Sequence, residues 1–416
     1  MKILIIGGGG REHAIAWKLN NENNIEKIYC APGNVGIAQV AECLNINDDN
    51  IEELLKFAKK NNIDLTIVGP EVPLVKGIVD KFEKEGLKVF GPNKECSQLE
   101  GSKAFSKEFM IRHNIPTAKY KEYTDIDEAI NEIDSFGYPV VIKADGLAAG
   151  KGVVIPQNRE EAITTLYEMM SHKKFGTAGD KIVVEEFLTG IETSILAFVD
   201  NNTIVPMVSA KDHKKVYNNE QGPNTGGMGT FSPSEIYTDE LAKEVEEKVL
   251  LATLNGFKKD ELDYKGILFI GLMITEEGAK VLEYNVRFGD PETQSVLFRL
   301  ETDLHKIIEA ILDNKLNEIE IKYKKEQAVC VMLTSGGYPE SYEKGKIIEG
   351  LNELDEDIVV FHSGTKMINN NLVTNGGRVL GITTSAENVE DAAIKIYENI
   401  NKINFEGMHY RTDIGI

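Results

Sequence analysis

The stretch Val281-Leu282-Glu283-Tyr284-Asn285-Val286-Arg287 runs directly into Phe288-Gly289-Asp290-Pro291-Glu292-Thr293-Gln294. The first seven residues have the composition of a β-strand, whose side chains alternate between two faces. Glu283, Asn285 and Arg287 are therefore expected on one face, opposite Leu282, Tyr284 and Val286. A carboxylate and an amide oxygen two residues apart suit Mg²⁺, and the guanidinium could hold a second anion. A solvated strand face with an incidental ion pair would give the same pattern.

A second signal is a small-residue loop between two apolar, β-branched runs, spanning residues 138–155. It predicts a hairpin whose tip closes over phosphates, because glycine permits close backbone approach and Lys143 and Lys151 supply charge. The loop differs from a Walker A loop. Three residues separate Gly146 from Gly150, Gly152 replaces the expected Ser or Thr, and a strand follows instead of a helix.

Composition limits the class of protein. A chain of 416 residues with 42% hydrophobic and 27% charged residues is typical of a globular protein of two to four domains. The net charge of -21 argues against nucleic acid as a partner. We expect no membrane association, since no apolar run is long enough to span a bilayer. The four cysteines lack metal-site spacing, which favours reduced thiols and a cytoplasmic location.

Residues 1 to about 100 alternate short apolar strands with helical patterns, which predicts a parallel α/β unit. Its first loop, Gly7-Gly8-Gly9-Gly10, resembles a dinucleotide fingerprint, but Glu12 stands at the third glycine position. The second strand also lacks the acid that would bind a ribose hydroxyl, so a nicotinamide cofactor is disfavoured. The helix that begins near Arg11 suits a phosphate monoester instead, and a purely structural tight turn is the alternative.

The rest of the chain contains further motifs. Ser102 to Met110 is predicted to be a helix with a serine cap, and Lys181 to Val184 a strand leading into an acidic segment. The run Gly222-Pro223-Asn224-Thr225-Gly226-Gly227-Met228-Gly229 is predicted to be a substrate-enclosing loop, with a flexible connection as the alternative. From about residue 326 onward, strands and a helix over Val389 to Ile400 predict another α/β segment without a catalytic cluster.

Together, these motifs resemble the ATP-grasp superfamily and, within it, the phosphoribosylamine-glycine ligase family, over essentially the whole chain. The resemblance rests on residues 7–14, 143–152, 212–214, 222–229 and 283–294. It implies a multidomain α/β and α+β fold. A parallel α/β domain would span 1–101, and an ATP-grasp domain 102–325 with a mobile lid at about 118–190. A small C-terminal α/β domain would span 326–416.

The resemblance also implies the site residues. The nucleotide would contact Lys103, Lys143, Gly150, Lys151, Glu185, Glu186, Leu188 and Glu192. Glu283 and Asn285 match the metal-binding pair, for Mg²⁺ or Mn²⁺, although the preceding strand offers no further acid. We expect Lys143, Arg287, Asp212 and Asp290 to act in catalysis. The two substrates would contact Gly9, Gly10, Arg11, Asp212, Gly226, Gly227, Met228, Arg287, Asp290, Pro291 and Glu292.

The implied reaction joins glycine to 5-phosphoribosylamine with ATP, through glycyl phosphate, in purine biosynthesis. Fixed cations would stabilise the charge that both steps spread over oxygens. The expected partners are small molecules, and the expected state is a monomer, with a dimer as the alternative. Two other functions remain open: an ATP-grasp ligase for a different amine or for carboxylation, and a nucleotide sensor or NAD-binding module without catalysis.

Overall fold

The computed structural model describes residues 1–148 and 152–416 of the chain. The N-terminal part is a parallel sheet in the order β3-β2-β1-β4-β5, as the strand and helix patterns predicted. Its strands are β1 Lys2–Gly7, β2 Lys27–Pro32, β3 Glu42–Cys43, β4 Leu65–Val68 and β5 Val89–Phe90. The helices are α1 Gly10–Asn20, α2 Ile51–Asn61, α3 Glu71–Val75, α4 Ile78–Lys84 and α5 Gln98–Gly101.

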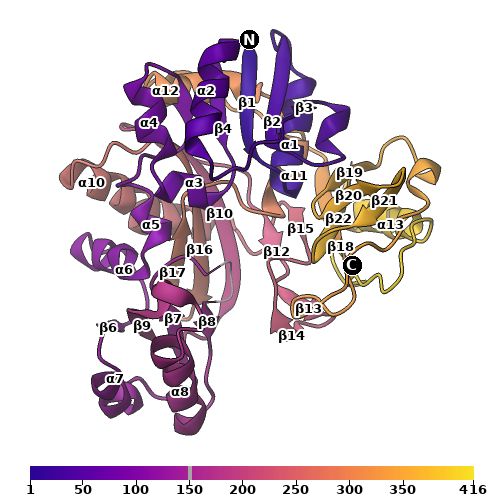
Figure 1. Ribbon diagram of the computed structural model, residues 1–416. Helices are drawn as coiled ribbons and strands as arrows, with labels where there is room; N and C mark the ends of the chain where they lie inside the picture. Colours follow the sequence, from indigo (N-terminus) through magenta and orange to yellow (C-terminus); the bar gives the residue numbers. More distant parts are fainter. Residues whose placement is uncertain (149–151) are drawn as a thin grey trace.

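A smaller unit projects from the molecule at the lower end of Figure 1. It consists of the antiparallel sheet β6-β9-β7-β8 with two helices. The strands are β6 Tyr120–Tyr123, β7 Val140–Ala144, β8 Val153–Val154 and β9 Ile182–Glu186, and the helices are α7 Ile126–Glu132 and α8 Arg159–Leu166. A separate apolar core that includes Ile142, Leu166 and Val184 holds this unit together. β7 and β8 form the hairpin that the sequence predicted.

The central sheet has the order β11-β10-β16-β17, and its last strand, β17, carries Glu283 and Asn285, the predicted metal-binding pair. The strands are β10 Ile191–Val199, β11 Ile204–Pro206, β16 Gly266–Thr275 and β17 Gly278–Asn285. The accompanying helices are α6 Lys103–Arg112, α9 Asp239–Val245 and α10 Leu251–Lys259. Ser102 caps α6 as predicted, since its hydroxyl accepts a hydrogen bond from Phe105 N at 3.1 Å. A core containing Leu4 and Tyr284 joins this sheet to the N-terminal unit.

The predicted alternation along β17 is wrong at one residue. Gly271 of β16 pairs with Glu283 while Leu272 pairs with Val281, so Leu282 is the extra residue of a β-bulge. Among the described residues, Val281, Tyr284 and Val286 belong to the apolar core, whereas Leu282 does not. The bulge leaves Glu283 and Asn285 on one face, because it precedes both of them.

The C-terminal sheet, β12-β15-β18-β22-β19, combines distant parts of the chain. The strands β18 Gln327–Thr334, β19 Val359–His362 and β22 Arg378–Ala386 come from the last segment, where α13 Val389–Ile400 matches its prediction. β12 Lys211–Asp212 and β15 Gly229–Ser232 come from the middle segment, and β15 is hydrogen-bonded to β18. A hairpin of β20 Thr365–Ile368 and β21 Asn371–Thr374 completes this unit. In Figure 1 its strands from the last segment are orange to yellow, whereas β12 and β15 are pink.

The glycine-dense run was predicted as a loop, and this is only partly correct. Gln221–Asn224 is strand β14, which pairs with β13 Lys215–Tyr217, and Gly229 begins β15. Residues 225–228 connect β14 to β15. Two helices follow β17: α11 Glu292–Arg299, which is buried throughout, and α12 Leu304–Leu312, which is buried on one side. α11 packs against α1, β15 and β18. Within 1–148 and 152–416, no helix is long and apolar enough to cross a membrane.

Candidate active site

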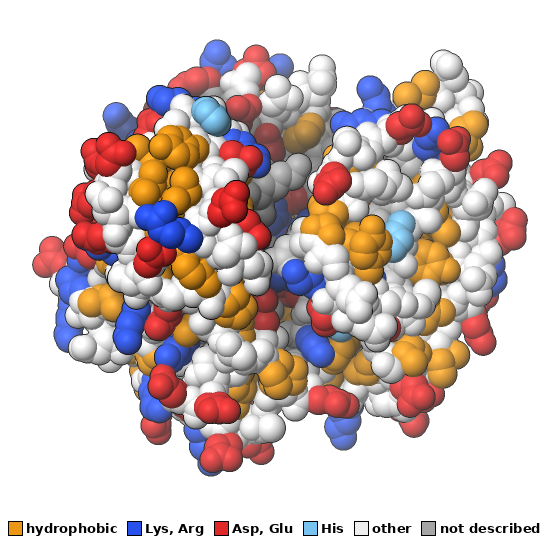
Figure 2. Space-filling view, turned by 90° about the horizontal axis from the view of Figure 1, so that it is seen from below, with side chains coloured by type: hydrophobic (Ala, Val, Ile, Leu, Met, Phe, Trp, Pro, Cys, Tyr) orange, Lys and Arg blue, Asp and Glu red, His pale blue; other side chains and the backbone are white. Residues whose placement is uncertain are grey.

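The predicted site residues gather around the carboxyl end of β17 and the start of α11. The glycine loop after β1, strand β12 and residues 225–228 surround them. The face of the molecule seen in Figure 2 is hollowed near its centre, and basic and acidic side chains border the hollow.

Glu283 lies among positive charges. Its Oε2 atom is 3.6 Å from Nζ of Lys103, at the start of α6. Burial raises the pKa of the Glu283 carboxyl, but Lys103, Lys214, Lys143 and Arg287 together lower it to about 2. The carboxylate is therefore ionised over the whole physiological range, as a metal ligand must be.

Arg287 is held by carboxylates that the sequence analysis did not identify. Its Nη2 atom is 3.0 Å from Oε1 of Glu100, and its Nε atom is 3.5 Å from Oε2 of Glu71. Glu100 also accepts a hydrogen bond from the Val286 amide at 2.8 Å. The guanidinium donates to Oδ1 of Asn285 at 3.3 Å, so Asn285 and Arg287 face the same side as predicted.

Lys143 is buried and points toward β17. Its ammonium group is 2.8 Å from Oε1 of Glu185 and donates to the carbonyl of Leu282 at 3.1 Å. Glu185 also pairs with Lys107, whose Nζ atom is 2.9 Å from Oε2. Burial raises the pKa of Glu185, but the two lysines outweigh this and lower it. The Glu185 side chain therefore faces lysines rather than open space.

Asp290 is paired with a residue from the C-terminal sheet. Arg378 is 3.1 Å from Oδ2 of Asp290, and it donates to the carbonyls of Asp290 and Gly226, both at 2.6 Å. Gln294 donates to Oδ1 of Asp290 at 2.7 Å. Burial opposes ionisation, but Arg378 and Arg11 lower the pKa of Asp290. Sequence analysis found no functional cluster in the C-terminal segment, so it missed Arg378.

Asp212 is a predicted carboxylate with an unsatisfied oxygen atom. Within the described part of the chain, its buried Oδ1 atom has no hydrogen-bond partner. Burial and the neighbouring Glu292 raise its pKa well above the ordinary value. A side chain added at Gly227, which has φ +119°, would come within 2.7 Å of this oxygen and 2.4 Å of Pro291 Cδ. The glycine thus brings the 225–228 segment directly onto Asp212.

The glycine loop is shaped by Glu12. Its Oε2 atom accepts a hydrogen bond from the Gly9 amide at 2.7 Å, and Oε1 is 2.6 Å from Nε of Arg11. Arg11 also donates to the Phe288 carbonyl at 3.0 Å. A side chain at Gly10 would lie 2.6 Å from Ser363 Oγ and 3.5 Å from Asp290 Oδ1. Gly9, Gly10 and Arg11 therefore lie beside Asp290. Glu12, which stands where a dinucleotide fingerprint would have its third glycine, holds the loop through Gly9 and Arg11.

The remaining predicted residues are spread around this centre. Glu186 accepts a hydrogen bond from the Lys119 amide at 2.9 Å, and Glu192 pairs with Lys214 at 2.5 Å. Leu188 and Met228 are buried, and Met228 belongs to the C-terminal core. Gly150 and Lys151 lie outside the described residues.

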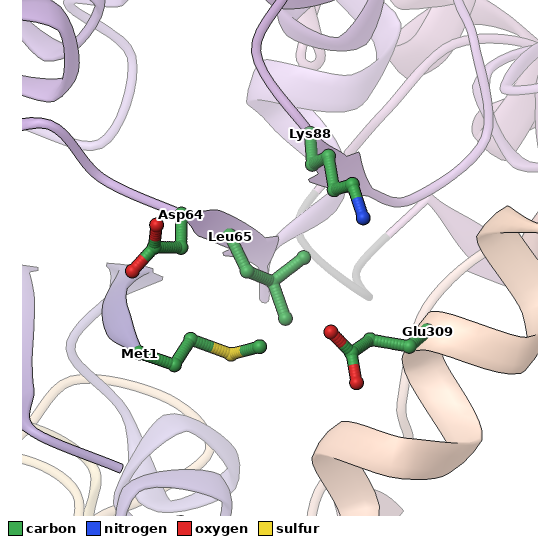
Figure 3. Close-up of a pocket in the computed structure, with 5 residues that line it drawn as sticks. All are labelled: Met1, Asp64, Leu65, Lys88 and Glu309. Carbon is green, nitrogen blue, oxygen red and sulfur yellow. The ribbon is translucent and has the colours of Figure 1, made fainter. Parts of the chain in front are cut away.

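A pocket elsewhere in the protein is unrelated to this centre. It is lined by Met1, Asp64, Leu65, Lys88 and Glu309. Figure 3 shows the side chains of Met1, Leu65 and Glu309 directed into the same space. Because β1 begins at Lys2 and β4 at Leu65, this pocket lies at the amino ends of the strands. Of the predicted residues, Gly9, Gly10 and Arg11 instead follow the carboxyl end of β1, where ligands bind in open α/β sheets.

Sequence models of one family match three consecutive segments of the chain. The N domain of phosphoribosylglycinamide synthetase matches residues 1–100, its ATP-grasp (A) domain residues 101–293 and its C domain residues 328–416. The chain belongs to the phosphoribosylglycinamide synthetase family. The sequence-based assignment and the predicted ATP-grasp ligase fold are thereby confirmed.

Individual members of the phosphoribosylglycinamide synthetase family are similar along their whole length. A phosphoribosylamine-glycine ligase from Halalkalibacterium halodurans is 49% identical over 415 residues, covering 100% of this chain and 96% of the relative. One from Caldanaerobacter subterraneus is 50% identical, covering 100% and 99%. The crystal structure of such a ligase from Thermotoga maritima superposes with a TM-score of 0.87 at 34% identity, covering all of both chains.

The fold extends beyond the family. The biotin carboxylase domain of the Hydrogenobacter thermophilus 2-oxoglutarate carboxylase gives a TM-score of 0.76 at 17% identity, covering 98% of this chain and 91% of that one. That structure is a complex with MgADP and bicarbonate.

Proposed function

We propose that the protein joins glycine to 5-phosphoribosylamine with ATP, giving glycinamide ribonucleotide, ADP and phosphate in purine biosynthesis. The observation that carries the proposal is the full-length similarity to relatives named phosphoribosylamine-glycine ligase. The site adds physical support, because it gathers lysines, arginines and carboxylates around the end of one strand.

The nucleotide is assigned to the space between the hairpin lid and β17. Lys103 and Lys143 supply positive charge beside Glu283, which suits a polyanionic triphosphate. Glu186 at the end of β9 and the residues that follow it, Leu188 and Glu192 among them, would line the base and the ribose, whereas the Glu185 side chain faces Lys107 and Lys143. Gly150 and Lys151 belong to the same proposal by their position in the sequence of the lid hairpin.

The donor atoms present fit a Mg²⁺ or Mn²⁺ ion. Glu283 offers an ionised carboxylate, and Asn285 offers an amide oxygen on the same face of β17. Within 1–148 and 152–416, no cluster of three or more His, Cys, Asp or Glu side chains could hold a metal alone. Two protein oxygens with phosphate oxygens completing the shell is the usual arrangement for Mg²⁺. When bound, the ion would neutralise charge on the transferring phosphoryl group.

The chemistry divides into two substitutions. A carboxylate oxygen of glycine attacks the γ-phosphorus of ATP, ADP leaves, and glycyl phosphate forms. The amine nitrogen of 5-phosphoribosylamine then attacks the acyl carbon, phosphate leaves, and the nitrogen loses a proton. Lys143 and Arg287 would stabilise the negative charge that spreads over oxygens in both steps. An enclosed site would protect the acyl phosphate from water.

The substrate assignments follow from the state of each acidic group. Asp212 has an unsatisfied buried oxygen and a raised pKa, so an ammonium group beside it would satisfy and ionise it. Asp290 is already paired with Arg378, and it also lies beside Gly9 and Gly10. We therefore assign it to supporting the Gly9 to Arg11 loop as well as to contacting a substrate. The ribose 5-phosphate is assigned to that loop.

The test is ADP release measured with purified protein, Mg²⁺ and defined substrates. We expect sustained release over many turnovers only when ATP, glycine and 5-phosphoribosylamine are all present, because the amine is needed to consume glycyl phosphate. Replacing glycine by alanine or by bicarbonate separates this function from another ATP-grasp ligase or a carboxylase. Nucleotide binding without ADP release under any combination would instead support a sensor, and would contradict the proposal.

A further inference from the structure

Glu185 of β9 lies between two buried lysines from different elements. Lys107 of α6 approaches Oε2 at 2.9 Å, and Lys143 of β7 approaches Oε1 at 2.8 Å. Lys107 is 2% exposed, Lys143 6% and Glu185 2%, so water screens their charges poorly. Removing either lysine would leave the carboxylate with a single counter-charge.

Both lysines are also tied to the strand that carries Glu283. Lys143 donates to the Leu282 carbonyl at 3.1 Å. Lys107 donates to Thr117 Oγ1 at 2.8 Å, and that hydroxyl donates to the Val281 carbonyl at 2.6 Å. The cluster therefore connects α6, the sheet β6-β9-β7-β8 and the bulge of β17. The bulge lies immediately before the proposed metal ligands Glu283 and Asn285.

The charges of the cluster do not cancel. Two ammonium groups and one carboxylate leave a net charge of +1. An ammonium has three donors, and Lys143 directs one to the Leu282 carbonyl and lies against Glu185, which leaves donor capacity for a ligand. If Lys107 were neutral, Lys143 and Glu185 would form a neutral pair, and their attraction for a phosphate would fall.

We propose that Lys107 is a positioning residue for the nucleotide: it neutralises Glu185, so that Lys143 keeps its charge available to the ATP phosphates. The inference rests on the proposed function, and it adds a residue that touches neither substrate nor metal. A cluster that serves only to connect the lid to the core would show no such charge dependence.

The experiment compares Lys107→Met with the double variant Lys107→Met/Glu185→Gln in the full chain. Calorimetric titration with ATP and Mg²⁺ gives the Kd, and steady-state kinetics gives kcat and the KM for each substrate. Lys107→Met should raise the Kd and KM for ATP about tenfold or more, because the loss of one net positive charge beside the phosphates in a poorly screened site costs at least this much. The KM for glycine should stay within about twofold, since Lys107 acts only through Lys143.

The double variant supplies the decisive comparison. Its cluster again carries +1, so its Kd for ATP should return to within about threefold of the wild type. A connecting role predicts the reverse, with the second substitution weakening the protein further. Lys121→Met is the matched control, because Lys121 lies on the neighbouring strand β6 with exposed partners. It should leave the Kd for ATP unchanged.

An unchanged Kd for ATP in Lys107→Met overturns the inference while leaving the proposed function intact. If Lys107→Met does not fold, the folded double variant decides, and loss of ATP binding in it overturns the inference. Failure of the wild-type protein to bind ATP would instead contradict the proposed function itself.

Discussion

The sharpest test of the site is Glu283→Gln, which removes one charge and preserves the shape of the side chain. The surrounding cations lower the pKa of Glu283 from 4.5 to about 2. A shift of this size corresponds to about 3 kcal/mol of interaction with the ionised form. The side chain is 28% exposed, so we treat this as an upper value.

The sign of the pH dependence follows from the direction of the shift. A carboxyl whose pKa is lowered on folding stabilises the protein above its unfolded pKa, and loses that contribution as the pH falls toward the folded value. Glu283→Gln should therefore lower the free energy of unfolding by up to about 3 kcal/mol at pH 7, and by about half as much at pH 3. Urea unfolding of both proteins at the two pH values measures the difference.

The effect on catalysis should be larger than the effect on stability. Loss of the proposed carboxylate ligand should reduce glycine-dependent ADP release by at least about 10²-fold to 10³-fold. Glu277→Gln, in the turn before β17 and 78% exposed, is the control and should change neither quantity. A Glu283→Gln protein that releases ADP within tenfold of the wild-type rate would remove Glu283 from the metal role. If wild type and Glu283→Gln had the same free energy of unfolding at both pH 7 and pH 3, the electrostatic reasoning would be refuted.

Three further perturbations test other parts of the site. Asp212→Asn removes a carboxyl whose raised pKa makes the folded protein lose stability as the pH rises. At pH 8 the Tm of the variant should therefore exceed that of the wild type by about 2 °C or more, and its KM for an amine substrate should rise at least tenfold. Gly227→Ala should lower kcat/KM by about 10²-fold with an unchanged Kd for ATP, because the added methyl collides with Pro291, and an unaltered kcat/KM would contradict this. Arg411→Ala removes a buried guanidinium that contacts Glu220 at 2.8 Å and donates to the Lys215 carbonyl at 3.1 Å, so it should lower the free energy of unfolding by about 3 kcal/mol or more. Urea unfolding measures this loss, and an unchanged free energy of unfolding would contradict it.

Local patterns predicted the elements that local physics decides. Val389 to Ile400 was predicted to the residue, since helical periodicity and the Asn388 cap lie within a few positions. The hairpin around Lys143 and the oxygen pair on β17 followed from the same kind of signal.

The features that the sequence did not reveal depend on distant partners. The bulge at Leu282 is set by the pairing of β17 with β16, and nothing in the local pattern marks it. Arg378 reaches Asp290 across 88 positions of the chain, and Glu100 reaches Arg287 across 187. Ion pairs of this kind come from topology, which a single sequence does not specify beyond the general class of fold.

The C-terminal sheet, whose strands come from the middle and the last segments of the chain, limits how the polypeptide can be divided. The segments matched by the A and C domains of the family end at 293 and begin at 328, yet β15 and β18 are neighbouring strands of one sheet. Cutting the polypeptide between them would leave two unpaired edges, each inviting self-association. The halves are therefore expected to be soluble only when co-expressed, as complementary fragments that rebuild the missing hydrogen bonds.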